Sequence, residues 1–260
     1  MQGRLSPGTN PSLPLGGDKM KIVALIASHG RDAILRDCIS CIKPQVSEIV
    51  LVGSSEWCDG TQGCKLAKKI AKKEDLIYVD HTNKILGRKW QAGLDRCRGL
   101  DPDAVLICGS DDLLSNDWVE KSIEASSFNP LTGVNEWYVY NPLVNELILV
   151  EYVRGVREDP LGAGRMINSG LLDKIDWEIF PHKGGIGCDT FSYKVLNKCN
   201  KGYANPETVI LSVKGDWDMI DSWEALINAN TINVYEEPDA FKFLNEHFPH
   251  IDFYKYRGIE

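Results

Sequence analysis

Short apolar runs alternate with amphipathic segments along the first 115 residues. Runs of aliphatic and β-branched residues predict buried strands at Lys21–Ser28, Glu48–Val52, Leu76–Asp80 and Ala104–Cys108. Between these runs, apolar residues at helical spacing predict helices at Ile34–Ile42, Gln62–Lys73 and Lys89–Arg98. Strands that alternate with helices form βαβ units, so we expect an α/β fold with a mostly parallel central sheet flanked by helices.

The pattern becomes less regular after residue 115. The predicted elements are a helix, an antiparallel strand pair, a second helix, a late strand and a terminal helix: Asn116–Ser126, Trp137–Asn141 with Leu147–Tyr152, Cys188–Asn197, Thr208–Val213 and Asp239–Phe248. Residues 1–18 are rich in Gly, Pro and Ser, and we interpret them as a flexible tail. We expect one domain over residues 19–260, with a nucleotide-binding half (19–115) and an acceptor-side half (116–260) that contains a smaller antiparallel region.

Length and charge narrow the classes of protein. A chain of 260 residues can bury a sizeable core, and a formal net charge of −8 disfavours wholesale non-specific binding to DNA or an anionic membrane. We find no apolar run of membrane-spanning length and no secretory signal, so we expect a cytoplasmic protein. Its eight cysteines are then reduced. A zinc site at Cys38-x-x-Cys41 is disfavoured because this pair lies inside a predicted helix and no compact second pair follows.

The fourth predicted strand ends in Gly109-Ser110-Asp111-Asp112. Ligands of parallel α/β sheets bind beyond the carboxyl ends of the strands, where this acidic pair emerges. Adjacent carboxylates repel each other unless a cation lies nearby, and hard oxygen ligands suit Mg²⁺ or Mn²⁺, which usually hold the phosphates of a substrate. The alternative is that Ser110 or Asp111 only caps the next helix.

Three common phosphate-binding or nucleophile motifs are missing. The turn after the first strand is Ser28-His29-Gly30-Arg31, which is not the G-x-G-x-x-G of a dinucleotide-binding fold. Neither a P-loop nor a G-x-S-x-G elbow occurs. The acidic pair, acting through a metal ion, is therefore the best phosphate-handling feature of the sequence.

The order of these features resembles the GT-A glycosyltransferases, particularly the family 2-like inverting enzymes, with phage-type members as a candidate subgroup. The resemblance covers about Lys21–Val213. It depends on four motifs that follow successive elements: Cys58-Asp59-Gly60-Thr61, Asn83-x-x-x-Gly87-x-Lys89-x-x-x-Gly93, the DXD-like Ser110-Asp111-Asp112, and Gly187-Cys188-Asp189 at a helix start.

The resemblance implies a hexosyltransferase that moves a sugar from a nucleotide-sugar, with a UDP-sugar as the expected donor, to an acceptor hydroxyl with inversion. Asp112 would bind the Mn²⁺ or Mg²⁺ ion that bridges the donor diphosphate, and Asp111 would contact ribose or the donor sugar. Asp189 would be the general base that takes the proton of the acceptor hydroxyl. Capping of its own helix is the alternative role for Asp189.

Other residues are candidates for donor contact. Arg165 follows a glycine-containing loop and could reach phosphate or carboxylate, or form a salt bridge to a structural acid. Lys214 stands where relatives often have a third metal ligand and could neutralise the leaving diphosphate, unless it is an ordinary surface lysine. The remaining predicted donor contacts are Ser28, Arg31, Glu56, Asp59 and Lys89, with Glu56 or Asp59 replacing an acidic pair that relatives carry after the second strand.

The acceptor is left open by the sequence, because relatives glycosylate sugars, lipid carriers, proteins and, in some phages, modified DNA bases. The predicted helix over Gln62–Lys73 carries a lysine stripe that could contact DNA, which makes a hydroxymethylated DNA base a candidate acceptor. A solvated helix face is the alternative. Two other functions are a sugar-1-phosphate nucleotidyltransferase and a non-catalytic nucleotide-sugar-binding protein.

Overall fold

The computed structural model describes residues 19–28, 32–55, 64–153, 155, 158–182, 187–214, 223–237 and 239–258. The predicted tail over residues 1–18 lies outside them. Three βαβ units build the first part of the chain, in this order: β1 (Ile22–Ala27), α1 (Asp32–Ile42), β2 (Glu48–Gly53), α2 (Cys64–Glu74), β3 (Ile77–Asp80), α3 (Leu86–Arg98) and β4 (Ala104–Gly109). The predicted strands and helices of this region are therefore confirmed, with ends that shift by a few residues.

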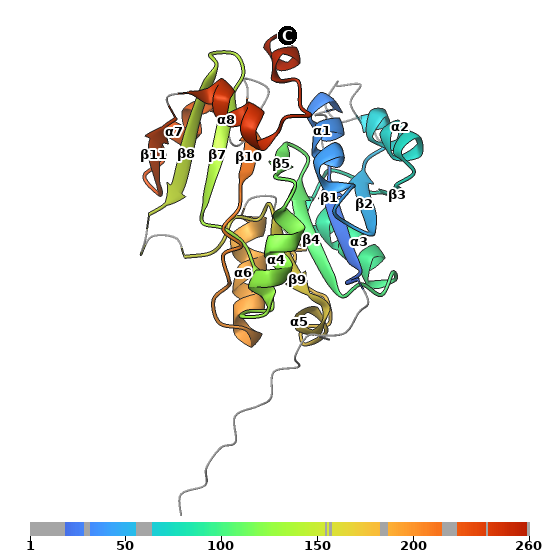
Figure 1. Ribbon diagram of the computed structural model, residues 1–260. Coiled ribbons are helices and arrows are strands. Elements are labelled where there is room, and N and C mark those ends of the chain that lie inside the picture. The colour runs from blue at the N-terminus through green and yellow to red at the C-terminus, as the bar shows by residue number, and fades with distance from the viewer. Residues whose placement is uncertain are drawn as a thin grey trace, which may run out of the picture.

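These strands form the centre of a six-stranded sheet of order β3-β2-β1-β4-β9-β6 (Figure 1). The first four strands are parallel, whereas β9 (Arg165–Asn168) runs antiparallel to β4, and β6 (Leu131–Thr132) runs antiparallel to β9. The expected mostly parallel central sheet is confirmed. The carboxyl ends of β1 and β4 lie side by side, because Ala27 pairs with Gly109.

A second, five-stranded sheet of order β11-β8-β7-β10-β5 lies beside the first one (Figure 1). Its strands are β5 (Asp112–Leu114), β7 (Glu136–Asn141), β8 (Glu146–Tyr152), β10 (Ile210–Val213) and β11 (Ile232–Glu236). The predicted antiparallel pair is confirmed as β7 and β8. Asp112, which we predicted just beyond the end of the fourth strand, also begins a short strand, β5, and pairs with Ser212 of β10, so the chain passes from one sheet to the other at the acidic pair.

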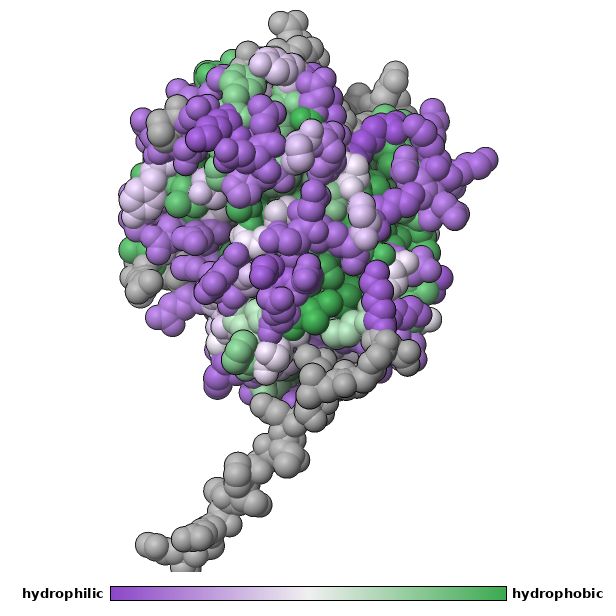
Figure 2. Space-filling model, in the orientation of Figure 1, coloured by the Kyte–Doolittle hydropathy of each residue, from purple (hydrophilic) through white to green (hydrophobic). Residues whose placement is uncertain are grey.

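The remaining elements are α4 (Trp118–Ser126), α5 (Ser169–Asp173), α6 (Cys188–Cys199), α7 (Trp223–Ile227), α8 (Ala240–His247) and a 3₁₀ helix, η1 (Phe253–Gly258). Hydrophilic side chains cover most of the face in Figure 2, and an apolar area interrupts them beside α4. In the described part of the chain, no helix is both long enough and apolar enough to cross a bilayer.

Both faces of the central sheet are buried. Alternate residues of β1 belong to two different core clusters: Ile22, Ala24 and Ile26 pack with residues of α1 and α2, and Val23 and Leu25 pack with residues of α3 and α5. A strand buried on both faces needs apolar residues at every position, which explains its unbroken apolar run. Because both faces of the sheet are packed against helices, the carboxyl ends of β1 and β4 are held in a fixed position.

Candidate active site

The acidic pair lies at the carboxyl end of β4, and both carboxylates are buried, with 5% and 7% exposure for Asp111 and Asp112. Lys214 forms an ion pair with Asp111, with Nζ 2.6 Å from Oδ2. Ser212 Oγ donates a hydrogen bond to Oδ1 of Asp112. The capping alternative for Ser110 or Asp111 is wrong, because α4 begins at Trp118 and Asp117 occupies its N-cap position.

Gly109 allows the two carboxylates to converge. A Cβ atom at this position would lie 3.2 Å from Oδ1 of Asp111 and still closer to Oδ2 of Asp112, so a larger residue would displace the pair. Behind them, burial raises the pKa of the Cys108 thiol well above its usual value, with smaller contributions from Cys38 and from the acidic pair. Cys108 is therefore a neutral thiol, and the negative charge at this edge belongs to the aspartates.

Lys214 follows β10 and is 9% exposed, so the surface-lysine alternative is wrong. Its backbone N–H donates to the carbonyl of Tyr140 at 2.9 Å, which fixes the start of the side chain beside β7. The ammonium group compensates the charge of buried Asp111. Its predicted contact with a donor diphosphate stays a prediction.

Two of the predicted donor contacts, Ser28 and Lys89, are in direct contact. Lys89 of α3 is only 1% exposed, and its Nζ donates to the carbonyl of Ser28 and, at 2.5 Å, to Oδ1 of Asn83. Lys89 thus holds the carboxyl end of β1 to the loop that precedes α3. These contacts show how the edge of the sheet at the end of β1 is stabilised, and donor contact by either residue stays a prediction.

Asp189 lies in the first turn of α6. Gly187 occupies the N-cap position with a φ of 75°, a left-handed conformation that glycine adopts readily, and its carbonyl accepts the Phe191 N–H at 2.9 Å. The capping role for Asp189 is therefore wrong. The amino end of a helix favours a carboxylate electrostatically. Burial raises the pKa of neighbouring Cys188 to about 11, with a smaller contribution from Asp189, so this thiol is neutral at pH 7.

Arg165 begins β9 and is 1% exposed. Its Nη1 donates to Ser192 Oγ at 2.7 Å and to the carbonyl of Asp189 at 3.3 Å, and its Nη2 donates to the carbonyl of Pro160 at 2.7 Å. The guanidinium is therefore engaged by protein groups of the loop before β9 and of the first turns of α6. Donor contact by Arg165 stays a prediction.

The antiparallel pairing of β4 and β9 brings Asp189 to the same edge as the acidic pair. Ile107 pairs with Arg165, so the chain after β4 and the chain before β9 leave the sheet together. Gly162, three residues before Arg165, packs against the carboxylate of Asp189, and a Cβ atom there would lie 2.5 Å from Oδ2 and closer still to Oδ1. The site therefore combines an acidic pair, a buried lysine and a separate carboxylate.

Several predicted residues lie outside the described part of the chain. These are the donor contacts Arg31, Glu56 and Asp59. Among the described residues, no three His, Cys, Asp or Glu side chains form a ready-made metal site, and Cys38 and Cys41 are buried within α1. Sequence reasoning missed Ser212 and Ser192. The signal for Ser212 was a hydroxyl that follows three apolar residues inside the predicted strand Thr208–Val213.

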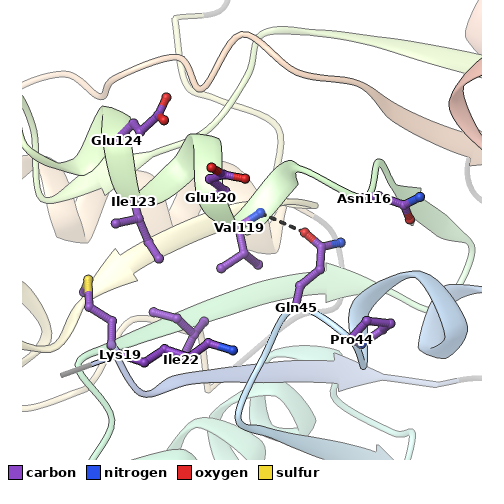
Figure 3. A pocket seen from close by; sticks show the side chains of 10 residues that line it. Lys19, Ile22, Pro44, Gln45, Asn116, Val119, Glu120, Ile123 and Glu124 are labelled. Atoms are coloured by element: carbon purple, nitrogen blue, oxygen red, sulfur yellow. Dashed lines mark hydrogen bonds between the residues drawn. The ribbon is translucent and has the colours of Figure 1, made fainter. Parts of the chain in front are cut away.

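A pocket of about 350 Å³ lies away from this site, at the amino end of β1 (Figure 3). It is lined by residues of α4 together with Ile22, Pro44 and Gln45. The Gln45 amide donates to the carbonyls of Cys41 and Ser115 and accepts from the Val119 N–H at 3.0 Å. Gln45 therefore joins α1 to α4, and the pocket is a packing junction at the opposite end of β1 from Ser28.

No protein-family model matches the sequence, and no curated protein is significantly similar to it. Solved structures are similar in fold. Residues 1–349 of S. aureus TarS in complex with UDP-GlcNAc align with a TM-score of 0.54 and 13% identity, over 75% of this chain and 59% of that chain. The mannosyltransferase PcManGT from Pyrobaculum calidifontis, in complex with GDP-Man and Mn²⁺, aligns with a TM-score of 0.51 and 15% identity, over 75% and 57%.

The protein has a GT-A-like glycosyltransferase fold, which confirms the resemblance seen in the sequence. The chain corresponds to less than two thirds of the length of these structures, at 59% of the TarS fragment and 57% of PcManGT.

Proposed function

We propose that the protein is a glycosyltransferase that moves a sugar from a nucleotide-sugar to an acceptor hydroxyl. The observation that carries this proposal is the position of Asp189, held against Gly162 at the sheet edge where Asp111 and Asp112 also lie. The nucleotide-sugars in the two similar structures, UDP-GlcNAc and GDP-Man, support this class of donor. A hexose as the sugar and UDP as its carrier are the specific forms that we propose.

The acidic pair fits a divalent cation. Asp111 is paired with Lys214, so we assign Asp112 as the protein ligand. Mg²⁺ in proteins commonly uses one or two carboxylates and completes its coordination with substrate phosphates and water, and this fits a site without a third acidic ligand among the described residues. Mn²⁺ in PcManGT supports the same class of ion. When bound, the cation would neutralise charge on the diphosphate.

Asp189 and Lys214 have different roles in the proposed transfer step. Asp189 accepts the proton of the acceptor hydroxyl as its oxygen forms a bond to the anomeric carbon of the donor sugar. The bond from that carbon to the diphosphate oxygen breaks, and the nucleoside diphosphate leaves with the bonding electrons. A single displacement of this kind inverts the anomeric configuration. The Lys214 ammonium, fixed beside Asp111, stabilises the charge of the leaving group.

Nucleotide-sugar binding is the direct test of the proposed donor. We expect a UDP-sugar at 100 times its Kd, with Mn²⁺ present, to stabilise the fold by about 2.7 kcal/mol and raise Tm by roughly 5 to 10 °C. The Asp112→Asn variant should lose the part of this shift that depends on Mn²⁺. The measurement is a thermal-shift screen of UDP- and GDP-sugars with Mn²⁺, Mg²⁺ or EDTA. The absence of a shift with every nucleotide-sugar would contradict the proposal.

The released product distinguishes the proposed glycosyltransferase from the two other candidate functions, a sugar-1-phosphate nucleotidyltransferase and a non-catalytic nucleotide-sugar-binding protein. Transfer, or slow hydrolysis of the donor, releases a free nucleoside diphosphate. A nucleotidyltransferase running in reverse consumes pyrophosphate and gives a nucleoside triphosphate, and a non-catalytic binding protein releases nothing. Chromatography of the nucleotide products after incubation with the donor and pyrophosphate therefore distinguishes the three.

We propose DNA as a candidate acceptor, because α2 exposes a set of lysines. These are Lys68, Lys69, Lys72 and Lys73. The apolar side of the same helix is buried through Ala67, Ile70 and Ala71, so the basic side faces solvent. In Figure 1, α2 lies at the β3 end of the central sheet, which places this basic face to one side of the acidic edge.

Reversing three of these charges tests the DNA proposal. We expect a Lys68→Glu, Lys69→Glu and Lys72→Glu triple variant to weaken duplex binding at least tenfold and to reduce the salt dependence, because each phosphate contact adds about 0.9 to the slope of log K against log salt. A matched control reverses the exposed lysines Lys174, Lys198 and Lys201, which lie on or beside α5 and α6. Fluorescence anisotropy at several salt concentrations gives both quantities. Equal binding by the two triple variants would argue against DNA.

A further inference from the structure

The segment before β9 packs directly against the carboxylate of Asp189. A Cβ atom at Gly162 would lie 2.5 Å from Oδ2 of Asp189 and closer to Cγ and Oδ1, whereas real Cβ atoms essentially never approach other heavy atoms within 3.0 Å. The carboxylate therefore occupies the space that any other residue at position 162 would need. One side of Asp189 is defined by the backbone of this loop.

The same loop is joined to the first turn of α6 through Arg165. The guanidinium binds the carbonyl of Pro160 with Nη2, and the carbonyl of Asp189 and the hydroxyl of Ser192 with Nη1. Ser192 Oγ in turn donates to the carbonyl of Asp189 at 2.9 Å. Hydrogen bonds from a charged donor are stronger than neutral ones, so this buried link fixes the main chain of Asp189 relative to the loop.

Two more contacts fix the two ends of the loop. At the start, Thr190 Oγ1 donates to Oδ2 of Asp159 at 2.9 Å, and Asp159 is 6% exposed. At the end, the fully buried Trp118 donates from Nε1 to the carbonyl of Gly164 at 3.0 Å. A Cβ atom at Gly164 would collide with the Trp118 ring, and its φ is +75°, so this position also requires glycine. The loop thus connects Asp189 to the hydrophobic core.

We propose that residues 159–165 form the positioning element for Asp189, with Gly162 setting the place of its carboxylate and Arg165 that of its main chain. This proposal rests on the proposed function, in which Asp189 takes the acceptor proton. It gives Arg165 a role through Asp189 that differs from the donor contact predicted from the sequence. A displacement of about 1 Å at a reacting group can lower a rate about 100-fold, so a small steric change in the loop has a large expected effect.

The Gly162→Ala variant tests the steric part. We expect kcat to fall about 100-fold, while KM for the donor changes less than about threefold, because the added methyl group displaces the base and leaves the acidic pair in place. The matched control is Gly99→Ala, where φ is −68° and the nearest atom to an added Cβ lies at 3.6 Å. This control should keep the wild-type kcat within about twofold.

Arg165 provides a second, independent variant. Arg165→Lys keeps one charged donor and should retain more activity than Arg165→Met, with donor KM again nearly constant. A Gly162→Ala or Arg165→Met variant with wild-type kcat would overturn the positioning role. A fall in donor affinity that matches the fall in kcat would overturn it too, because the loop would then act on donor binding.

A double-mutant cycle separates positioning from general damage. In the Asp189→Asn background there is no base to position, so Gly162→Ala should cause no further loss in the residual single-turnover rate. Multiplicative losses in the double variant would overturn the proposal. If Asp189→Asn itself keeps the wild-type rate, the proposed base is wrong and the positioning role fails with it. If the Gly162 and Arg165 variants are fully active and Asp189→Asn is not, Asp189 remains the proposed base and the positioning role is wrong.

Discussion

Replacing Asp189 with asparagine is expected to lower kcat for sugar transfer about 1,000-fold and to leave donor affinity within about twofold of wild type. A general base contributes about 100- to 10,000-fold, and an amide cannot accept the acceptor proton at this position. Asparagine has nearly the same shape as aspartate, so its packing against Gly162 should be preserved. Release of nucleoside diphosphate measures the rate, and calorimetric titration with a UDP-sugar measures the affinity.

A conservative change of a surface carboxylate is the control for this experiment. Asp176→Asn alters a side chain that is 81% exposed and pairs only with the exposed side chain of Arg98 among the ion pairs of the described residues. Its backbone φ of 51° is tolerated by asparagine, so the variant should have wild-type kinetics. If Asp189→Asn kept more than a tenth of the rate, or lost donor binding, Asp189 would not be the base.

The central sheet could be predicted from the sequence because burial acts on both of its faces. Val23 and Leu25 enter one core cluster and Ile22, Ala24 and Ile26 the other, so the strand has no polar position. An unbroken apolar run bounded by polar turns is then a strong signal. The long β7–β8 pair was predictable for a similar reason, since its aromatic and β-branched residues favour strands.

The short and edge strands could not be predicted in this way. β6 has two residues and β5 has three, which is too few for any periodicity. β11 lies at an edge of its sheet, and four of its five residues are exposed, so its composition carries no burial signal. Their positions depend on pairing with distant strands. No local pattern therefore indicates that Asp112 begins a strand.

The sequence could predict which residues belong to the candidate site. It could not predict their hydrogen-bond and ion-pair partners. Asp111, Asp112 and Asp189 stand after a buried strand or at a helix start, and these positions mark them as candidates. The partners depend on the register that joins Asp112 to Ser212 across 100 residues. Lysine and arginine are usually exposed, so a local pattern gives no reason to expect that Lys89 and Arg165 are buried.

Removing the Lys214 ammonium is the second change with a large expected effect. Lys214→Met leaves Asp111 buried without its ion-pair partner, and loss of one member of a buried pair costs about 3 to 5 kcal/mol of unfolding free energy. We expect Tm to fall by roughly 6 °C or more. Lys121→Met, which breaks an ion pair between exposed side chains, should leave Tm unchanged.

A double variant separates the two roles that Lys214 has in our proposal. Lys214→Met with Asp111→Asn removes both charges, so most of the lost stability should return, because no unpaired carboxylate is then buried. Donor affinity should stay at least tenfold below wild type, since nothing replaces the ammonium beside the diphosphate. Thermal unfolding and titration with a UDP-sugar measure the two effects on the same samples. Recovery of both would show that Lys214 only balances the charge of Asp111. Recovery of stability alone supports an ammonium at the leaving group, provided that Asp111→Asn by itself keeps donor affinity within about twofold of wild type.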